Sequence, residues 1–149
     1  MSTTKKIKNI FVQGPVAPEF IGESIRKHST NTAIGAHSIF LGQVRGDGID
    51  GKKVAAIDYT AYEEMALAQM HLIREAIFEK YPLTCMHVYH SLGSVAVGEI
   101  CLFVFTSSAH RKAAIDACGE MVERIKAELP VWGKEVFEGE EGYRWKENR

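Results

Sequence analysis

The sequence predicts one α+β domain over residues 1–149, with a mixed or antiparallel sheet and three helices. Short apolar runs of strand length alternate with segments in which apolar residues recur at helical spacing. The run at 100–105 is apolar throughout, which predicts a central strand buried on both faces. The expected order of elements is β-α-β-β-α-β-β-α-β.

The elements expected in the first half are strands at 6–13, 36–45 and 54–62 and a helix at 18–28. Residues 46–53 hold three glycines after a strand. They lack the spacing of a Walker phosphate-binding loop, and no helix follows at once. We therefore expect a flexible, hairpin-like connection there.

The second half begins with a helix from Glu63 to Tyr81, whose expected buried stripe is Ala66, Met70, Ile73 and Ile77. Strands are expected at 83–90 and 99–106, joined by a connection at 91–98 with glycines at both ends. A long helix follows, with Ser107 or Ser108 as its N-cap and Pro130 as its end. A short extended piece at 134–137 and a terminal strand with Tyr143 and Trp145 complete the chain.

Composition bounds the function. The 46% hydrophobic and 25% charged content is ordinary for a globular domain, and a net charge of −1 disfavours a nucleic-acid binder. No apolar run has the length of a membrane span. The first residues are polar and no signal-like apolar segment follows them, which favours a cytoplasmic protein.

The three cysteines, at 85, 101 and 118, form no Cys-x-x-Cys pair and are interpreted as small core residues. His87 and His90 lie in one expected strand, where a spacing of three puts their side chains on opposite faces. We therefore expect no metal site from this pair.

The first turn of the last helix carries His110 and Arg111, although the positive end of a helix dipole favours acidic residues. Together with the unpaired N–H groups of that turn, these two side chains fit an anion site. Alternatively, both point into solvent, as most charged side chains do.

Lys126 lies near the other end of the same helix, where a cation is ordinary. It follows His110 by sixteen residues, so the two stand roughly 24 Å apart along the axis. One small ligand cannot contact both within one chain. Either the two residues serve different sites, or two chains combine opposite ends of this helix.

Five segments stand in a specific order along the chain: 40–45, 59–65, 90–93 with 98–99, 107–111, and Lys126 with 129–135. Together, between about Gly35 and Trp145, they resemble the large, catalytic subunit of molybdopterin synthase. The resemblance implies an α/β hammerhead fold with a small added antiparallel sheet. It also implies a homodimer of large subunits within a heterotetramer.

The implied enzyme is a sulfurtransferase of molybdenum-cofactor biosynthesis. It converts cyclic pyranopterin monophosphate to molybdopterin with two sulfurs from the C-terminal thiocarboxylate of a small ubiquitin-like subunit that ends in Gly-Gly. The partner delivers the sulfur, so this chain needs neither a catalytic cysteine nor a cofactor. The implied catalytic residues are Lys126 and Lys134. The implied substrate-binding residues are Gln43, Val44, Arg45, His110, Arg111, Lys126, Gly133, Lys134 and Glu135.

One position departs from the family pattern. Members often have Trp-Lys-Lys-Glu where this chain has Trp132-Gly133-Lys134-Glu135, and the first of those lysines binds substrate. We expect Lys134 to take over that role; alternatively, Lys126 acts alone. The missing lysine also leaves open a second function, a non-catalytic dimeric scaffold that binds a phosphate-bearing metabolite or a Gly-Gly protein tail.

Overall fold

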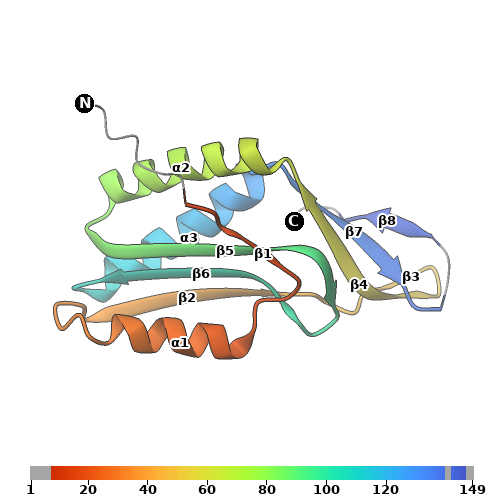
Figure 1. Ribbon diagram of the computed structural model, residues 1–149, viewed down its shortest axis with the longest axis horizontal. Helices are drawn as coiled ribbons and strands as arrows, with labels where there is room; N and C mark the ends of the chain where they lie inside the picture. Colours follow the sequence, from red (N-terminus) through yellow and green to blue (C-terminus); the bar gives the residue numbers. More distant parts are fainter. Residues whose placement is uncertain (1–7, 140–141, 147–149) are drawn as a thin grey trace.

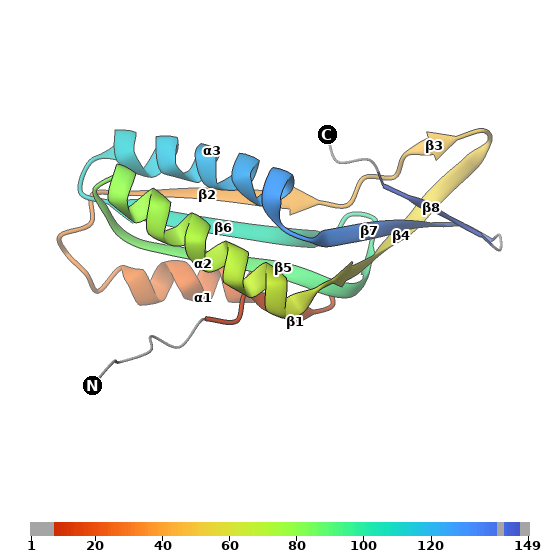
Figure 2. The same ribbon diagram turned by 90° about the horizontal axis from the view of Figure 1, so that it is seen from above.

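The computed structural model describes residues 8–139 and 142–146. Within these residues an eight-stranded sheet carries two helices on one face and one on the other (Figure 1, Figure 2). The helices are α1 (Pro18–His28), α2 (Glu63–Lys80) and α3 (Arg111–Glu128). The strands are β1 (Phe11–Gln13), β2 (Ala36–Gln43), β3 (Gly48–Ile49), β4 (Lys52–Ala61), β5 (Leu83–Ala96), β6 (Ile100–Ser108), β7 (Val131–Phe137) and β8 (Tyr143–Trp145).

The strand order is β2-β6-β5-β4-β7-β8, and β3 pairs with β4. These pairs are antiparallel, whereas β1 lies parallel to β5, so of the two predicted alternatives, mixed or antiparallel, the sheet is mixed. The long strand β5 pairs first with β6 and then, from Gly93, with β4. It thereby joins the main sheet to a smaller antiparallel extension made of β4, β7 and β8 (Figure 1).

The main core lies between the sheet and helices α2 and α3. The stripe predicted for α2 is buried there, and α3 contributes a matching stripe of Ala114, Ala117, Cys118, Met121 and Ile125. On β6, Leu102 and Val104 face these helices, whereas Phe103 and Phe105 belong to a separate cluster with Ile21 of α1. Strand β6 is thus buried on both faces, which confirms the prediction from its unbroken apolar run.

The glycine-rich segment at 46–53 folds into the expected hairpin. Strand β3 pairs with the start of β4 through Gly48 opposite Lys53, and the turn between them is Asp50-Gly51. Both turn residues have positive φ, 51° and 76°, which an Asp-Gly pair tolerates and a two-residue hairpin turn requires.

The start of α3 differs from the prediction of a serine N-cap. His110 is the N-cap, because β6 continues through Ser107 and Ser108, which pair with β2. The Ser108 hydroxyl still supports the helix: it donates to the His110 carbonyl and accepts from the Ala114 N–H at 3.1 Å. The serine therefore acts on the first helical turn from the preceding strand.

The predicted connection at 91–98 is also wrong, because β5 runs on to Ala96. Gly93, with φ 81°, lies where β5 changes partners, and glycine within a strand commonly marks such a bend. Strand β7 begins at Val131 rather than at 134, and described β1 is shorter than the 6–13 expected, of which residues 6 and 7 lie outside the described residues.

The terminal strand exists as predicted, but Tyr143 and Trp145 are not docked in the core; both are more than half exposed. Among the described residues, none of the helices combines the length and the apolar character needed to cross a bilayer.

Candidate functional site

Helix α3 carries exposed cationic side chains at its first turn. His110 and Arg111 are exposed, and an open hollow beside them is lined by Gly35, Ala109 and Lys112. A Cβ on Gly35 would lie 2.1 Å from the Ala109 carbonyl oxygen, so only glycine allows the two segments to approach this closely. The Arg111 guanidinium and the N–H groups of the first turn lie at this surface, whereas the Lys112 amine is paired with Asp116 at 3.0 Å. The predicted anion site therefore stays a prediction.

Lys126 lies in the last turn of α3, at the opposite end of the helix. It lines a cavity of about 250 Å³ between α3, β4, β5 and β7. The residues around this cavity are Tyr59, His90, Ile125, Lys126, Ala127, Leu129, Val131, Trp132, Gly133 and Lys146. The cavity mixes apolar side chains with the polar groups of Tyr59, His90, Lys126 and Lys146, so a ligand there can meet both kinds of surface.

Burial lowers the pKa of the Lys126 amine, and the positive charge of Lys146 acts in the same direction. Desolvation penalises the charged form of the amine, so its proton is easier to remove than that of a surface lysine. An amine of this kind can steer an anion while protonated and exchange a proton during a reaction.

His90 forms part of the cavity wall from the middle of β5. It is 3% exposed, and burial lowers its pKa to about 4. Its Nδ1 lies 2.8 Å from the Ser91 carbonyl oxygen, which only accepts, so Nδ1 carries the proton. The ring of Tyr59 meets it edge-on, at 5.3 Å between centroids. His90 is therefore neutral at pH 7 and adds no charge beside Lys126.

Gly133, where the family often has lysine, lies opposite Tyr59 in the β4–β7 pair. A Cβ at this position would meet Ile57 Cγ2 at 2.8 Å and Tyr59 Cε1 at 3.1 Å. The Tyr59 ring thus covers the glycine, and burial raises the pKa of its phenol. The missing side chain is a packing requirement of this cavity wall.

Lys134 and Glu135 point to opposite sides of β7. The Lys134 amine lies over the Tyr143 ring, 4.4 Å from its centroid, and it does not line the cavity of Lys126. Glu135 is 3% exposed and accepts a hydrogen bond from Arg144 at 2.8 Å, which ties β8 to β7. Lys134 can take over the role of the family lysine only if its amine moves away from the rings of Tyr143 and Trp145 and into the cavity.

Gln43, Val44 and Arg45 lie at the end of β2 and just beyond it. Gln43 and Arg45 are exposed, and Arg45 forms a surface ion pair with Asp47 at 3.4 Å. Val44 is 2% exposed and packs with the cluster beneath the cavity. Its N–H and carbonyl are both used, by Glu99 and Gly98, so its contribution to a ligand is limited to positioning its neighbours.

The structure divides the predicted residues into two groups. Gly133 lines the cavity with Lys126. Val44, which precedes Arg45 just beyond β2, packs in one buried cluster with Tyr59 of the cavity wall. His110 and Arg111 lie at the far end of α3, which is continuous from Arg111 to Glu128 (Figure 2). Within one chain the two groups stay roughly 24 Å apart.

Sequence reasoning missed the roles of Tyr59 and His90 in the cavity wall. The alternation along 54–62 predicts that Tyr59 lies in a strand, but it assigns no function to this residue. The spacing of His90 from His87 only argues that these two histidines do not bind one metal ion. Both residues have a polar side chain on the inward face of a strand, and the sequence pattern shows this. A polar side chain is uncommon in such a position unless another group of the protein interacts with it. That signal identifies a buried polar group but not the groups that it meets.

The sequence profile of the family described as "MoaE protein" matches residues 17–128 of this chain. The chain belongs to this family. A relative from Drosophila willistoni named "Molybdopterin synthase catalytic subunit" is 41% identical over 116 residues, which are 77% of this chain and 31% of the relative. A relative of the same name from Drosophila grimshawi is 41% identical over a stretch that covers 76% of this chain and 32% of the relative's length. The chain thus spans about a third of the length of these curated relatives.

Solved structures of MoaE proteins share the fold. Molybdopterin synthase from Staphylococcus aureus superimposes with a TM-score of 0.79 and 33% identity, over 92% of this chain and 95% of that one. A complex of subunits 1 and 2 of molybdopterin-converting factor from Helicobacter pylori matches over 93% of this chain and 90% of that one, with a TM-score of 0.77. At 18% identity, this second likeness concerns the fold alone.

We predict that Gly133→Ala lowers the free energy of unfolding by about 1–3 kcal/mol, because the new methyl group overpacks against Ile57 and Tyr59. Chemical denaturation measures the change. The matched control is Gly119→Ala in α3, where nothing lies within 4 Å of an added Cβ. That change should stabilise the protein by roughly 0.5–1 kcal/mol, since alanine favours helix. Equal effects of the two changes would contradict the packing argument.

We also predict that acid destabilises the protein between about pH 6.5 and pH 4. The folded pKa of His90 is lowered, by burial, to about 4, so the unfolded chain binds its proton first as the pH falls. The stabilisation from neutral His90 is complete above pH 6.5 and is lost toward pH 4, a change on the order of 3 kcal/mol. Burial lowers the pKa of His87 to about 4 as well, so it adds to the same loss.

Denaturation curves at pH 7 and pH 4 test this prediction. His90→Gln should lose less stability on acidification than the unchanged chain, because glutamine does not titrate. His71→Gln, on the partly exposed surface of α2, should not reduce the loss. An unchanged pH dependence in a folded His90→Gln protein would overturn the assignment.

Proposed function

We propose that this MoaE-family chain acts as the catalytic subunit of molybdopterin synthase. In this role it converts cyclic pyranopterin monophosphate to molybdopterin with sulfur from the thiocarboxylate of a small ubiquitin-like partner. The observation that carries the proposal is the half-buried Lys126 amine with its lowered pKa, at a cavity suited to a peptide tail. The names of the relatives support the same activity.

The complete site requires a second copy of the chain. His110 and Arg111 of one copy, with Arg45 of the other, bind the pterin and its phosphate, and Lys126 of that other copy lies where the thiocarboxylate tail meets the substrate. The continuity of α3 supports this arrangement, because no bend brings the two groups together in one chain. A two-fold pair of chains then holds two equivalent sites.

Each sulfur transfer exchanges one sulfur atom for one oxygen atom. The thiocarboxylate sulfur forms a C–S bond to a carbon of the pterin side chain as a C–O bond of that carbon breaks, which leaves the tail joined to the pterin as a thioester. Water then hydrolyses the bond between the tail carbonyl and the sulfur, so the sulfur stays on the pterin and the tail leaves as a carboxylate. Lys126 attracts the anionic tail in its protonated form and passes a proton to the departing oxygen. Its lowered pKa makes that proton easier to give up than the proton of a surface lysine.

The other predicted residues have graded roles in this proposal. Gly133 lets Ile57 and Tyr59 pack against β7 and so shapes the cavity wall, and Gln43 adds a polar group beside Arg45. Val44 and Glu135 act by fixing their strands, because both are buried. Lys134 contributes only if its amine leaves the rings of Tyr143 and Trp145.

The proposed partner is a small ubiquitin-like subunit that ends in Gly-Gly. The Helicobacter pylori structure, a complex of subunits 1 and 2 of molybdopterin-converting factor, supports a two-subunit assembly. We propose a homodimer of this chain with one small subunit at each outer end, located in the cytoplasm. The rival proposal, a scaffold that binds the same ligands without reaction, draws its support from the lysine missing at Gly133.

We predict that Lys126→Ala nearly abolishes molybdopterin formation with a thiocarboxylated partner, because the amine holds the anionic tail and passes a proton to the departing oxygen. The loss should be at least about 100-fold, the usual scale for a group that transfers protons in the reaction. Lys27→Ala, on the exposed surface of α1, is the control and should retain full activity. Near-normal turnover of a folded Lys126→Ala protein would refute the role, and no turnover of the unchanged chain would favour the scaffold.

We further predict recovery of activity in mixed dimers of Lys126→Ala and His110→Ala chains. Random pairing makes half of the dimers mixed, and each of these has one intact site of two, so activity should reach about a quarter of the unchanged level. The measurement is product formation after the two inactive proteins are unfolded together and refolded. Failure to recover activity in a confirmed mixed dimer would contradict a site shared between chains.

A further inference from the structure

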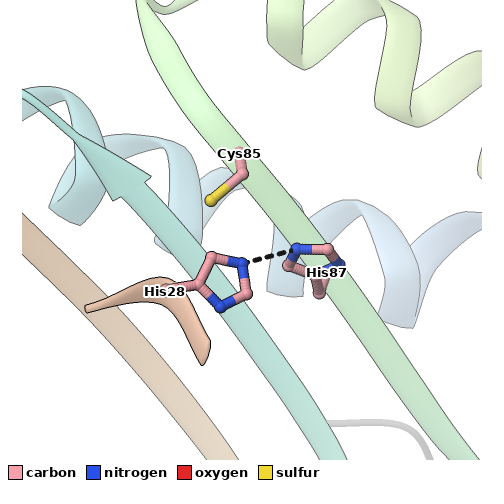
Figure 3. Close-up of side chains that lie close together, drawn as sticks. All are labelled: His28, Cys85 and His87. Atoms are coloured by element: carbon pink, nitrogen blue, oxygen red, sulfur yellow. Dashed lines mark hydrogen bonds between the residues drawn. The ribbon is translucent and has the colours of Figure 1, made fainter. Parts of the chain in front are cut away.

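The sheet face covered by α1 carries a cluster of His28, Cys85 and His87 that the proposed activity does not use. One ring nitrogen from each histidine and the Cys85 sulfur all lie within 4.8 Å of one another, and the three side chains are half-buried. Figure 3 shows the cysteine and His87 on β5 with His28 facing them from α1. Cys85 and His87 share this face because residues two apart on a strand point the same way.

Hydrogen bonds hold both histidines in a defined orientation. His28 Nδ1 lies 2.7 Å from the Ser24 carbonyl oxygen, which only accepts, so His28 carries its proton on Nδ1. The His28 Nε2 lone pair therefore points at His87 Nε2, 2.9 Å away (Figure 3). A histidine whose Nδ1–H is bound to a backbone carbonyl is the usual arrangement of a histidine metal ligand.

A buried aromatic side chain packs against one side of the cluster. Phe105, fully buried in β6, lies beneath the cluster, with its ring centroid 4.8 Å from that of His28 and 6.3 Å from that of His87. His28 is the last residue of α1, and the other two side chains come from β5. The ligand atoms therefore come from two elements whose positions are fixed by the core.

We propose that His28, Cys85 and His87 form a binding site for a borderline transition-metal ion such as Zn²⁺, with water as the fourth ligand. Two imidazoles and one thiolate are a donor set that zinc prefers, and three protein ligands leave one position open. Tetrahedral ligand atoms around zinc stand roughly 3.3–3.8 Å apart, so small side-chain rotations bring the present separations into range.

Binding releases one proton. The Cys85 thiol loses its proton to solvent and binds as thiolate, and His87 moves its own proton from Nε2 to Nδ1 through exchange with water. Lys8, whose amine is 2.9 Å from His87 Nδ1, is exposed and turns away, because both groups would then be donors. Arg74 stays bound to the Met86 carbonyl at 2.7 Å, and the thiolate offsets part of its positive charge.

The bound ion links the end of α1 to β5. It lies on the face of the sheet opposite α2 and α3, whereas Lys126 belongs to α3 (Figure 2). Metal binding here is therefore independent of sulfur transfer, and its test needs no activity assay.

The test is a titration of the full chain with Zn²⁺, after removal of any affinity tag, treatment with chelator and reduction of the thiols. We expect one ion per chain with a dissociation constant of about 1 µM or below. Cys85→Ser and His87→Gln should each weaken binding by about 100-fold or more, since loss of an outer partner alone costs 10–100-fold. His71→Gln and Cys118→Ala are the matched controls and should bind as the unchanged chain does.

Two measurements on the unchanged protein keep the proposal testable if a variant fails to fold. Co²⁺ in place of Zn²⁺ should give the intense absorption of a thiolate ligand, and saturating Zn²⁺ should slow alkylation of Cys85 at least about ten-fold. The proposal is overturned if the unchanged chain binds no Zn²⁺ at micromolar concentration. It is also overturned if folded Cys85→Ser binds as tightly as the unchanged chain, or if Zn²⁺ leaves alkylation of Cys85 unaffected.

Discussion

The continuity of α3 is the constraint on which the functional geometry depends. This helix is held to the sheet by a buried stripe from Ala114 to Ile125, so it cannot bend to bring its ends together. Its first turn presents His110 and Arg111 to solvent, and its last turn presents Lys126 to a cavity. A rigid helix that separates complementary groups creates a site only when chains associate. Association is thus part of the proposed chemistry.

The cavity around Lys126 illustrates how burial tunes the pKa of an amine. His90 stands in the same wall, and burial keeps its pKa near 4, so it is neutral where Lys126 changes its charge. Tyr59 packs against Gly133 and also contacts the ring of His90, so the same side chain fills the cavity wall and helps to bury the histidine. A change at any of these residues therefore alters the shape of the cavity, and a change that admits water to Lys126 reduces the desolvation that lowers its pKa.

The two faces of the sheet have separate chemical characters. The face under α2 and α3 carries the main core and the part of the proposed sulfur-transfer site that contains Lys126. The face under α1 carries aromatic rings and two histidines beside Cys85. The alternation of β5 sends His87 to one face and His90 to the other, as its spacing predicts. What the spacing does not reveal is that Cys85 and His28 stand beside His87.

The sequence by itself determined the fold class, the three helices, the buried stripe of α2, the central strand, a hairpin-like connection within 46–53 and the separation between His110 and Lys126. These follow from local periodicity and turn chemistry, which act within a few residues. Only the tertiary structure decided that β5 continues past Gly93, that Gly133 packs under Tyr59, that Lys134 lies over Tyr143, and that His28 meets Cys85. Each of those contacts joins residues distant in sequence, and their approach is set by sheet register and by the packing of whole elements.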